Sequence, residues 1–224
     1  MAQIVKKSDS EIQQDVLREL RWDTRVDETE VGVQVKDGIV ALSGIVSSWA
    51  KKTAAQQAAH RVLGVLDVAN DLEVKMAGTR TDADIAKAVR AALEWDVFVP
   101  HKRITSTVAQ GVVTLEGAAD YWSERDDAQH AIKNLEGVRG VINRIDVKPP
   151  AVATEQVRDN IEAALDRHAE REAKRVRLDI KDGRVTVSGT VGSWSEREAV
   201  TGAVRGTPGV RIVDNQLRIE PYSI

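Results

Sequence analysis

The 224-residue chain contains no cysteine, and its aromatic residues are limited to five Trp, two Tyr and one Phe. The lack of cysteine excludes disulfides, thiolate metal sites and cysteine nucleophiles. No apolar run approaches the ~18 residues needed to cross a bilayer, so we expect no integral membrane segment. The polar stretch SDSEIQQD stands where a signal peptide needs an apolar core. We therefore expect a cytoplasmic protein, or a periplasmic one if the sequence is a processed mature form.

A basic excess and catalytic motifs are also missing. The formal net charge is −3, whereas proteins that bind nucleic acid normally carry a clear basic excess, so no nucleic-acid partner is expected. The chain has no P-loop, G-x-S-x-G or dinucleotide-binding motif. No metal-ligand spacing recurs among its four histidines, which are His60, His101, His130 and His168. The sequence thus predicts no catalytic residue, no metal and no cofactor, and we expect a protein that is not an enzyme.

The chain does contain an internal repeat, in which one unit occurs three times. Five positions recur with spacings of 73 and then 72 residues, and a period of this length is a whole small domain rather than a solenoid turn. The recurring residues are Gly38, Gly111 and Gly183; Gly44, Gly117 and Gly189; Gly64, Gly137 and Gly209; Asn70, Asn143 and Asn215; and Trp49, Trp122 and Trp194. We interpret the glycines and asparagines as a structural framework, with each Asn bonding nearby backbone.

Each unit has the same pattern of apolar residues. Steps of four, as in Ile12, Val16 and Leu20, predict a first helix. An alternating strand, a turn such as K-D-G and a return strand then predict a hairpin, whose return strand should close on Gly44, Gly117 or Gly189. A second helix is expected to start from the N-caps Ser47, Asp120 or Gly192 and to end at Gly64, Gly137 or Gly209. A final apolar strand completes an α-β-β-α-β unit.

The predicted fold class is therefore α/β (α+β), with three tandem sandwich domains at residues 1–77, 78–149 and 150–224. In each, two helices should pack on one face of a three-stranded mixed sheet. The turn-rich segments KMAGTRTD and KPPAVATE connect the units. A unit of roughly 65 ordered residues has a marginal core by itself. We therefore expect the units to pack on one another, on a partner or on a second copy of the chain in a homo-oligomer.

The repeated core resembles the BON domain family of bacteria. It is carried by VGVQVKDGIVALSGIVSSW in the first unit, ITSTVAQGVVTLEGAADYW in the second and VRLDIKDGRVTVSGTVGSW in the third, each followed by a G-V and an Asn. The resemblance implies an α/β sandwich, no known catalytic activity and an association with osmotic and envelope stress. In some members, pairs of these domains bind anionic phospholipid, and one cytoplasmic relative senses potassium. This chain departs from the familiar two-domain envelope form, because it has three copies, no recognisable export signal and no lipidation cysteine.

Two sets of residues are candidates for contact with a lipid or a partner. Trp49, Trp122 and Trp194 should lie in the first turn of each second helix, where a Trp suits an inter-domain seam or a lipid headgroup layer. Trp22 and Trp95 form a further matched pair, replaced by Arg167 in the third unit. The other set is a basic cluster in the third unit, for which a solvated helix end is the alternative interpretation. It comprises Arg167, Arg171, Lys174, Arg175 and Arg177.

These observations favour a non-catalytic binding or scaffold protein of the osmotic or envelope stress response. Its ligand would be an anionic phospholipid or an envelope-associated partner, engaged through the BON domains. The alternative is a soluble cytoplasmic protein without membrane contact, which senses an ion such as potassium or acts on client proteins as a chaperone does. An enzyme ranks far below both.

Overall fold

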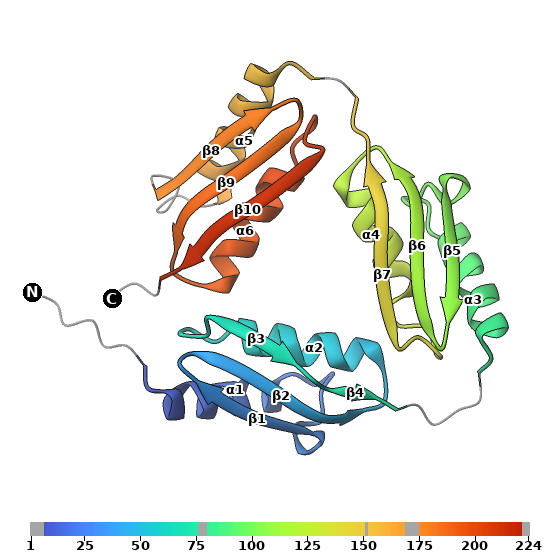
Figure 1. Ribbon diagram of the computed structural model, residues 1–224, viewed down its shortest axis with the longest axis vertical. Coiled ribbons are helices and arrows are strands. Elements are labelled where there is room, and N and C mark those ends of the chain that lie inside the picture. Colours follow the sequence, from blue (N-terminus) through green and yellow to red (C-terminus); the bar gives the residue numbers. More distant parts are fainter. Residues whose placement is uncertain (1–6, 76–79, 151, 169–174, 221–224) are drawn as a thin grey trace, which may run out of the picture.

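The computed structural model describes residues 7–75, 80–150, 152–168 and 175–220, with the side chains of 166–168 excepted. It contains three units of one design, each with two helices on one face of a three-stranded mixed sheet (Figure 1). The first unit comprises α1 (Asp9–Trp22), η1 (Glu28–Glu30), β1 (Val31–Lys36), β2 (Ile39–Val46), α2 (Trp49–His60), β3 (Asp67–Asn70) and β4 (Glu73–Val74). Here the third strand is interrupted, and both of its pieces pair with β2.

The other two units repeat this order. The second unit consists of α3 (Asp82–Trp95), η2 (His101–Arg103), β5 (Ile104–Ala109), β6 (Val112–Ala119), α4 (Trp122–Ile132) and β7 (Gly140–Val147). The third consists of α5 (Thr154–His168), β8 (Val176–Lys181), β9 (Arg184–Val191), α6 (Trp194–Arg205) and β10 (Ile212–Ile219). In each sheet the central strand pairs antiparallel with the strand before it and parallel with the strand after it.

The apolar periodicity read from the sequence places the core correctly. Ile12, Val16 and Leu20 are buried on α1, where they face Val40 and Leu42 of β2 within a single cluster. Equivalent clusters fill the second and third units. Capping boxes start α1 at Ser8 with Glu11 and α3 at Thr81 with Asp84. Each unit thus has its own core.

The return strand does not close on its glycine, which corrects the sequence-based expectation. β2 continues beyond Gly44 to Val46, and β6 and β9 continue likewise beyond Gly117 and Gly189. At Gly44 φ is +130°, and a Cβ there would overlap the carbonyl oxygen of Glu30. The glycine therefore permits a close backbone approach inside a strand rather than the exit from it.

Both predicted ends of the second helix also need correction. The N-caps are Ser48, Tyr121 and Ser193, one residue later than Ser47, Asp120 and Gly192. Ser48 prevails over Ser47 because its hydroxyl oxygen accepts a hydrogen bond from the Lys51 amide at 3.2 Å. The helices end before Gly64, Gly137 and Gly209, which lie in the following turn. There a Cβ at Gly64 would crowd Ile12 of the first helix at 3.2 Å.

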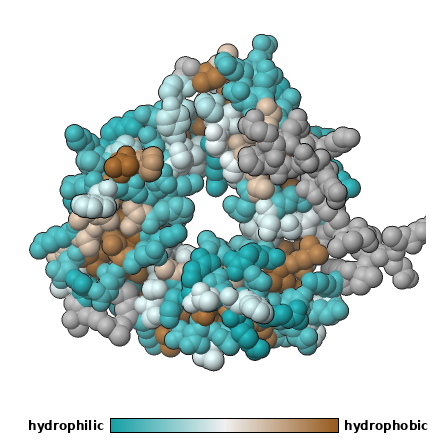
Figure 2. Space-filling model, turned by 180° about the vertical axis from the view of Figure 1, so that it is seen from behind, coloured by the Kyte–Doolittle hydropathy of each residue, from teal (hydrophilic) through white to brown (hydrophobic). Residues whose placement is uncertain are grey.

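Figure 1 shows the three units at the corners of a triangle, and Figure 2 shows that their side chains leave an opening at its centre. Contacts between elements are concentrated within units, so the triangle depends on a few side chains between them. Those side chains include the three recurring tryptophans.

Candidate functional site

Trp194 joins the third unit to the first. Its indole Nε1 donates a hydrogen bond to the carbonyl oxygen of Leu66 at 3.0 Å, and its ring stacks on His60 with centroids 4.0 Å apart and planes at 12°. The Arg197 guanidinium, one helical turn further along α6, lies 4.7 Å from the centroid of the same ring. Trp194 also packs on the core of the first unit. The first and third units, which are not consecutive in the chain, are thus joined by one aromatic side chain.

Trp122 joins the second unit to the third in a matching way. Arg205 at the end of α6 lies 4.9 Å from the centroid of the Trp122 ring, and Arg125 of its own helix lies 5.1 Å from it. Cations over the indole face are attracted by its quadrupole. Pro149 and Thr207 line a small cavity beside the ring. The Trp122 Nε1 is buried, and among the described residues it has no hydrogen-bond acceptor, so this seam lacks the bond that Trp194 makes.

Trp49 completes the set by packing on the core of the second unit. His60 and Arg205, which contact Trp194 and Trp122, occupy equivalent positions of the repeat, and Lys133 is the corresponding residue of the second unit. Of the two uses expected for these residues, inter-domain seam and lipid headgroup layer, the structure shows contacts of the first kind. Each second helix thus begins with a Trp that packs on the next unit around the triangle.

The recurring asparagines tie the last strand to the second helix. Asn143 donates from Nδ2 to the Arg125 carbonyl oxygen at 2.9 Å and accepts from the Ile145 amide at 3.2 Å. Asn70 makes the same pair of bonds in the first unit, and Asn215 replaces the helix carbonyl with the Thr201 hydroxyl at 2.8 Å. These bonds agree with a structural role.

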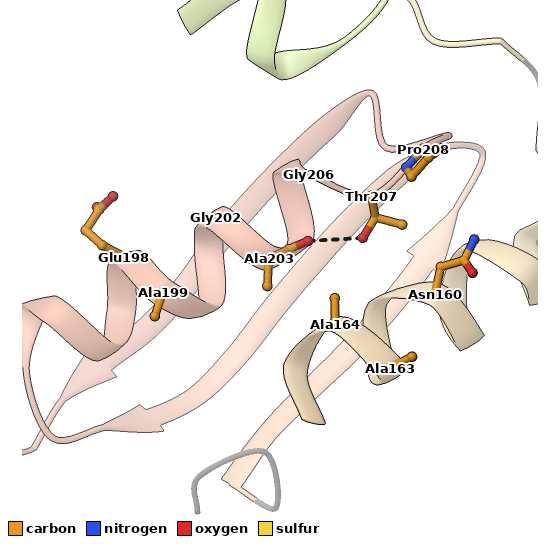
Figure 3. A pocket seen from close by; sticks show the side chains of 10 residues that line it. All are labelled: Asn160, Ala163, Ala164, Glu198, Ala199, Gly202, Ala203, Gly206, Thr207 and Pro208. Carbon is orange, nitrogen blue, oxygen red and sulfur yellow. Dashed lines mark hydrogen bonds between the residues drawn. The ribbon is translucent and has the colours of Figure 1, made fainter. Parts of the chain in front are cut away.

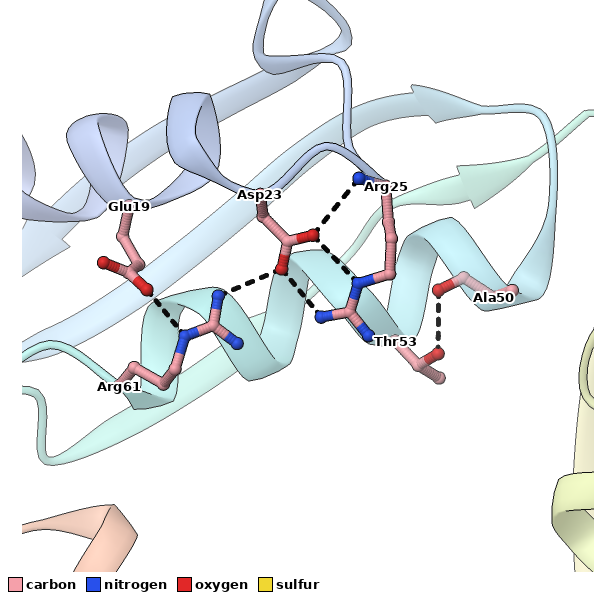
Figure 4. A network of polar contacts seen from close by, with 6 residues as sticks. All are labelled: Glu19, Asp23, Arg25, Ala50, Thr53 and Arg61. Carbon is pink, nitrogen blue, oxygen red and sulfur yellow. Dashed lines mark hydrogen bonds and ion pairs between the residues drawn. The ribbon is translucent and has the colours of Figure 1, made fainter.

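The groove between the two helices differs from unit to unit. In the first unit an ion network crosses it (Figure 4): the Asp23 carboxylate accepts from the Arg25 guanidinium at 2.7 Å and from Arg61 at 3.0 Å. Arg61 also donates to Glu19 at 2.6 Å. These hydrogen bonds, that from Arg25 first, hold the pKa of Asp23 well below its usual range.

In the second unit the same groove is open and apolar. It encloses about 780 Å³ and is lined by Ala88, Ala91, Ala92, Trp95, Asp96, Val97, Phe98, Ala131 and Leu135. Three neighbouring apolar side chains stand out of it, with Trp95 90%, Val97 88% and Phe98 71% exposed. Apolar surface is visible over this unit, on the left of Figure 2. In the third unit the groove of about 620 Å³ has a more polar lining that includes Asn160, Glu198 and Thr207 (Figure 3).

The remaining predicted contact residues are scattered. Trp22 is 78% exposed at the end of α1, and like Trp95 it lies outside the seams. Arg171 and Lys174 lie outside the described residues, as does the side chain of Arg167 at the end of α5. Arg175 and Arg177 are exposed at the start of β8. The predicted basic cluster therefore lies partly outside the described residues, and its five members cannot be placed together within them.

Sequence reasoning missed the groove of the second unit. Its signal was present, because Arg25 and Arg61 of the first unit correspond by the repeat to Phe98 and Asn134. Within the described ranges, no group of three or more His, Cys, Asp or Glu residues could hold a metal ion. In that same part of the chain, no helix has the length and apolar character needed to span a bilayer.

The chain is thus built from three copies of a small α/β domain, and comparison with known proteins identifies the family of this domain. The BON domain family matches residues 8–76, 81–149 and 153–221, so the chain belongs to the BON domain family. Osmotically-inducible protein Y of Escherichia coli (strain K12) is 31% identical over 126 residues, which cover 54% of this chain. The matched region spans 63% of that relative's length.

Solved structures offer weaker likenesses. CdsD, a structural protein of the type III secretion system of Chlamydia trachomatis, is 13% identical over 93% of this chain and 92% of its own, with a TM-score of 0.28. The PrgH periplasmic domain is also 13% identical, over 92% of this chain and 99% of its own, with a TM-score of 0.21. Scores this low do not indicate a shared arrangement of the three units.

Proposed function

We propose that this chain is a non-catalytic binding protein of the bacterial osmotic stress response, and that it engages an envelope-associated protein partner. The name of its osmotically inducible relative supports the first part. The observation that carries the second is the exposed aromatic surface, with Trp95 90% and Phe98 71% exposed. Large apolar side chains gathered in the open are typical of interaction sites.

The seams and this surface divide the tryptophans into two groups. Trp49, Trp122 and Trp194 are partly buried against neighbouring units and support the ring. Trp22 and Trp95 lie outside the seams, at the ends of α1 and α3. A scaffold whose domains are held together by one set of aromatic contacts can offer a second set to a partner.

Charge favours a protein over an anionic phospholipid as the ligand of the second unit. Trp95 stands between Glu94 and Asp96, while Arg103 is paired with Asp120 at 2.8 Å. Anionic headgroups attract clusters of unpaired lysine and arginine, and carboxylates beside the exposed indole oppose such an approach. The lipid is therefore the competing outcome of the experiment.

The test combines cells and vesicles. In a strain that lacks this protein, the wild-type chain should restore growth at high osmolarity, whereas the Trp22→Ser/Trp95→Ser double variant should not. Ile142→Ser, which alters an exposed apolar residue on β7, is the matched control. Full rescue by the double variant would refute the proposal. Binding to phosphatidylglycerol vesicles would show a lipid ligand instead, and a rise in melting temperature with potassium but not sodium would show an ion sensor.

A further inference from the structure

The helix groove of the second unit is a variant of a groove that, in the first unit, is already occupied by arginine side chains. Asp23 and Asp96 are equivalent by the repeat, and each ends its helix as the C-cap. Each also accepts a hydrogen bond from the amide two residues later, that of Arg25 at 3.2 Å and that of Phe98 at 3.0 Å. The backbone around the two carboxylates is thus the same, and the difference lies in what reaches them.

In the first unit, two guanidinium groups complete the site. Arg25 and Arg61 bond Asp23 from opposite sides, and Glu19 holds Arg61 in place. Charge-assisted bonds of this kind are the strong ones among hydrogen bonds in proteins. The groove there is closed by the chain's own cations.

In the second unit the residues that would supply these groups are changed. Phe98 stands for Arg25, Asn134 for Arg61 and Ala92 for Glu19. In the described part of the chain, Asp96 therefore receives no guanidinium. Asp127 on α4 lies close enough to interact with it: burial first, and the charge of Asp96 second, raise the pKa of the Asp127 carboxyl. Asp96 thus lines the apolar groove, with Asp127 near it on α4, and among the described residues the charge that opposes this effect on Asp127 is that of His130 rather than of an arginine or lysine.

We propose that the α3–α4 groove binds a segment of a partner protein that carries an arginine or lysine beside apolar residues. The cation lies at Asp96 and Asp127, as Arg25 and Arg61 lie at Asp23 in the first unit. The apolar residues pack on Trp95, Phe98 and Leu135, in the manner of an amphipathic helix in a groove. This inference rests on the proposed function in one respect, since both require a protein partner.

The third unit provides an internal contrast. By the repeat, Arg167 stands in the sequence where the second unit has Trp95, and Thr207, which lines the third unit's groove, stands where the second has Leu135. Among the described residues no aromatic side chain lines this groove, so it serves as a matched region of the same fold.

A defined peptide tests the proposal on the full chain. The probe is a fluorescein-labelled helical peptide of leucine, alanine and arginine, and its control has glutamate in place of arginine. Fluorescence anisotropy should show binding of the arginine peptide alone. Asp96→Asn/Asp127→Asn should weaken binding about tenfold or more, whereas Asp23→Asn in the first unit should leave it unchanged.

A second variant separates binding from folding. Phe98→Arg/Asn134→Arg recreates the arginines of the first unit, so it should abolish peptide binding while the melting temperature stays the same or rises. Equal binding of both peptides, or unchanged affinity in this variant, would overturn the proposal. So would a dimer that depends on Trp95 in sedimentation, or vesicle binding that depends on Trp95, because each identifies another occupant. Failure of peptide binding with loss of rescue in the Trp22→Ser/Trp95→Ser variant would refute this inference and leave the proposed function standing.

Discussion

Replacement of Trp194 by alanine should open the ring at the seam between the third and first units. Besides its packing on the core of the first unit, the indole makes two specific interactions across this seam. The hydrogen bond from Nε1 to the Leu66 carbonyl, at 3.0 Å, contributes about 1 kcal/mol. The stack on His60, with centroids 4.0 Å apart, contributes about 0.5–1.5 kcal/mol. The contact with Arg197 is made within one helix and is not counted.

The loss therefore amounts to about 1.5–2.5 kcal/mol, which shifts the ratio of closed to open rings about ten- to seventyfold. The other two seams also have a covalent connection between their units, whereas this seam joins units that are not consecutive in the chain. Loss of the side-chain contacts should therefore affect this seam more than the others.

The absence of native cysteine makes the measurement direct. Cysteines introduced at the exposed positions Lys36 of β1 and Arg218 of β10 carry a donor and an acceptor fluorophore, and energy transfer reports the distance between the first and third units. Trp194→Ala should lower the transfer efficiency. Trp194→Phe, which keeps a stack but loses the hydrogen bond, should lower it less. Trp95→Ala removes an exposed tryptophan away from the seams and should leave it unchanged. Equal transfer in the wild type and Trp194→Ala would refute the role of this seam.

Three further predictions concern single residues. Gly44→Ala should destabilise the first unit in urea unfolding by about 3 kcal/mol, since φ there is +130° and a Cβ would overlap Glu30; Gly202→Ala, in α6 with open space around it, should stabilise by about 0.5–1 kcal/mol. Asn143→Ala should cost about 1–3 kcal/mol in the same assay, because it breaks the bond from β7 to the Arg125 carbonyl of α4 and the bond that Asn143 accepts from the Ile145 amide within β7; a cost no larger than that of a surface substitution would contradict this. Burial lowers the pKa of His60, and the nearby charges of Asp67 and Arg197 act in opposite directions on it. The seam should therefore be at full strength above the ordinary histidine pKa of about 6.5 and weaken as the pH falls below it, because the open state binds the proton more readily; energy transfer should fall with pH in the wild type and stay constant in His60→Phe.

The elements of each unit could be predicted because their signals are local. Ile12, Val16 and Leu20 mark a helix face within three turns, and the positive φ of Asp37 and Gly38 follows from a two-residue hairpin turn. The errors of one residue at the caps arise where two neighbours can both act, as Ser47 and Ser48 can. The end of the second helix was misplaced because Gly64 has a different task, the close approach to Ile12.

The seams could be anticipated only in part. The repeat indicates that the three tryptophans share a contact role, but it does not show which residues of a neighbouring unit they contact. Leu66 and Trp194 are 128 residues apart, and no periodicity relates a donor in one domain to an acceptor in another. The groove of the second unit is the opposite case. The sequence does contain its difference from the first unit, since Asp96, Phe98 and Asn134 stand where the first has Asp23, Arg25 and Arg61. Only the network in the structure, however, shows that these positions act together.

The geometry of the seams explains why a partner must bind elsewhere. Each seam joins two different surfaces, the start of a second helix in one unit and a face of the next unit. Such a head-to-tail interface either continues indefinitely or closes into a ring. Here Trp194 of the third unit contacts His60 and Leu66 of the first. A chain of two units would leave one Trp-bearing surface and one surface that receives a Trp unpaired, whereas the third unit pairs both of them within the molecule. The surfaces free to differ between units are then those outside the seams, and the helix grooves do differ: in the first unit Arg25 and Arg61 bond Asp23, whereas in the second the equivalent Asp96 lies beside an exposed Trp95 and Phe98.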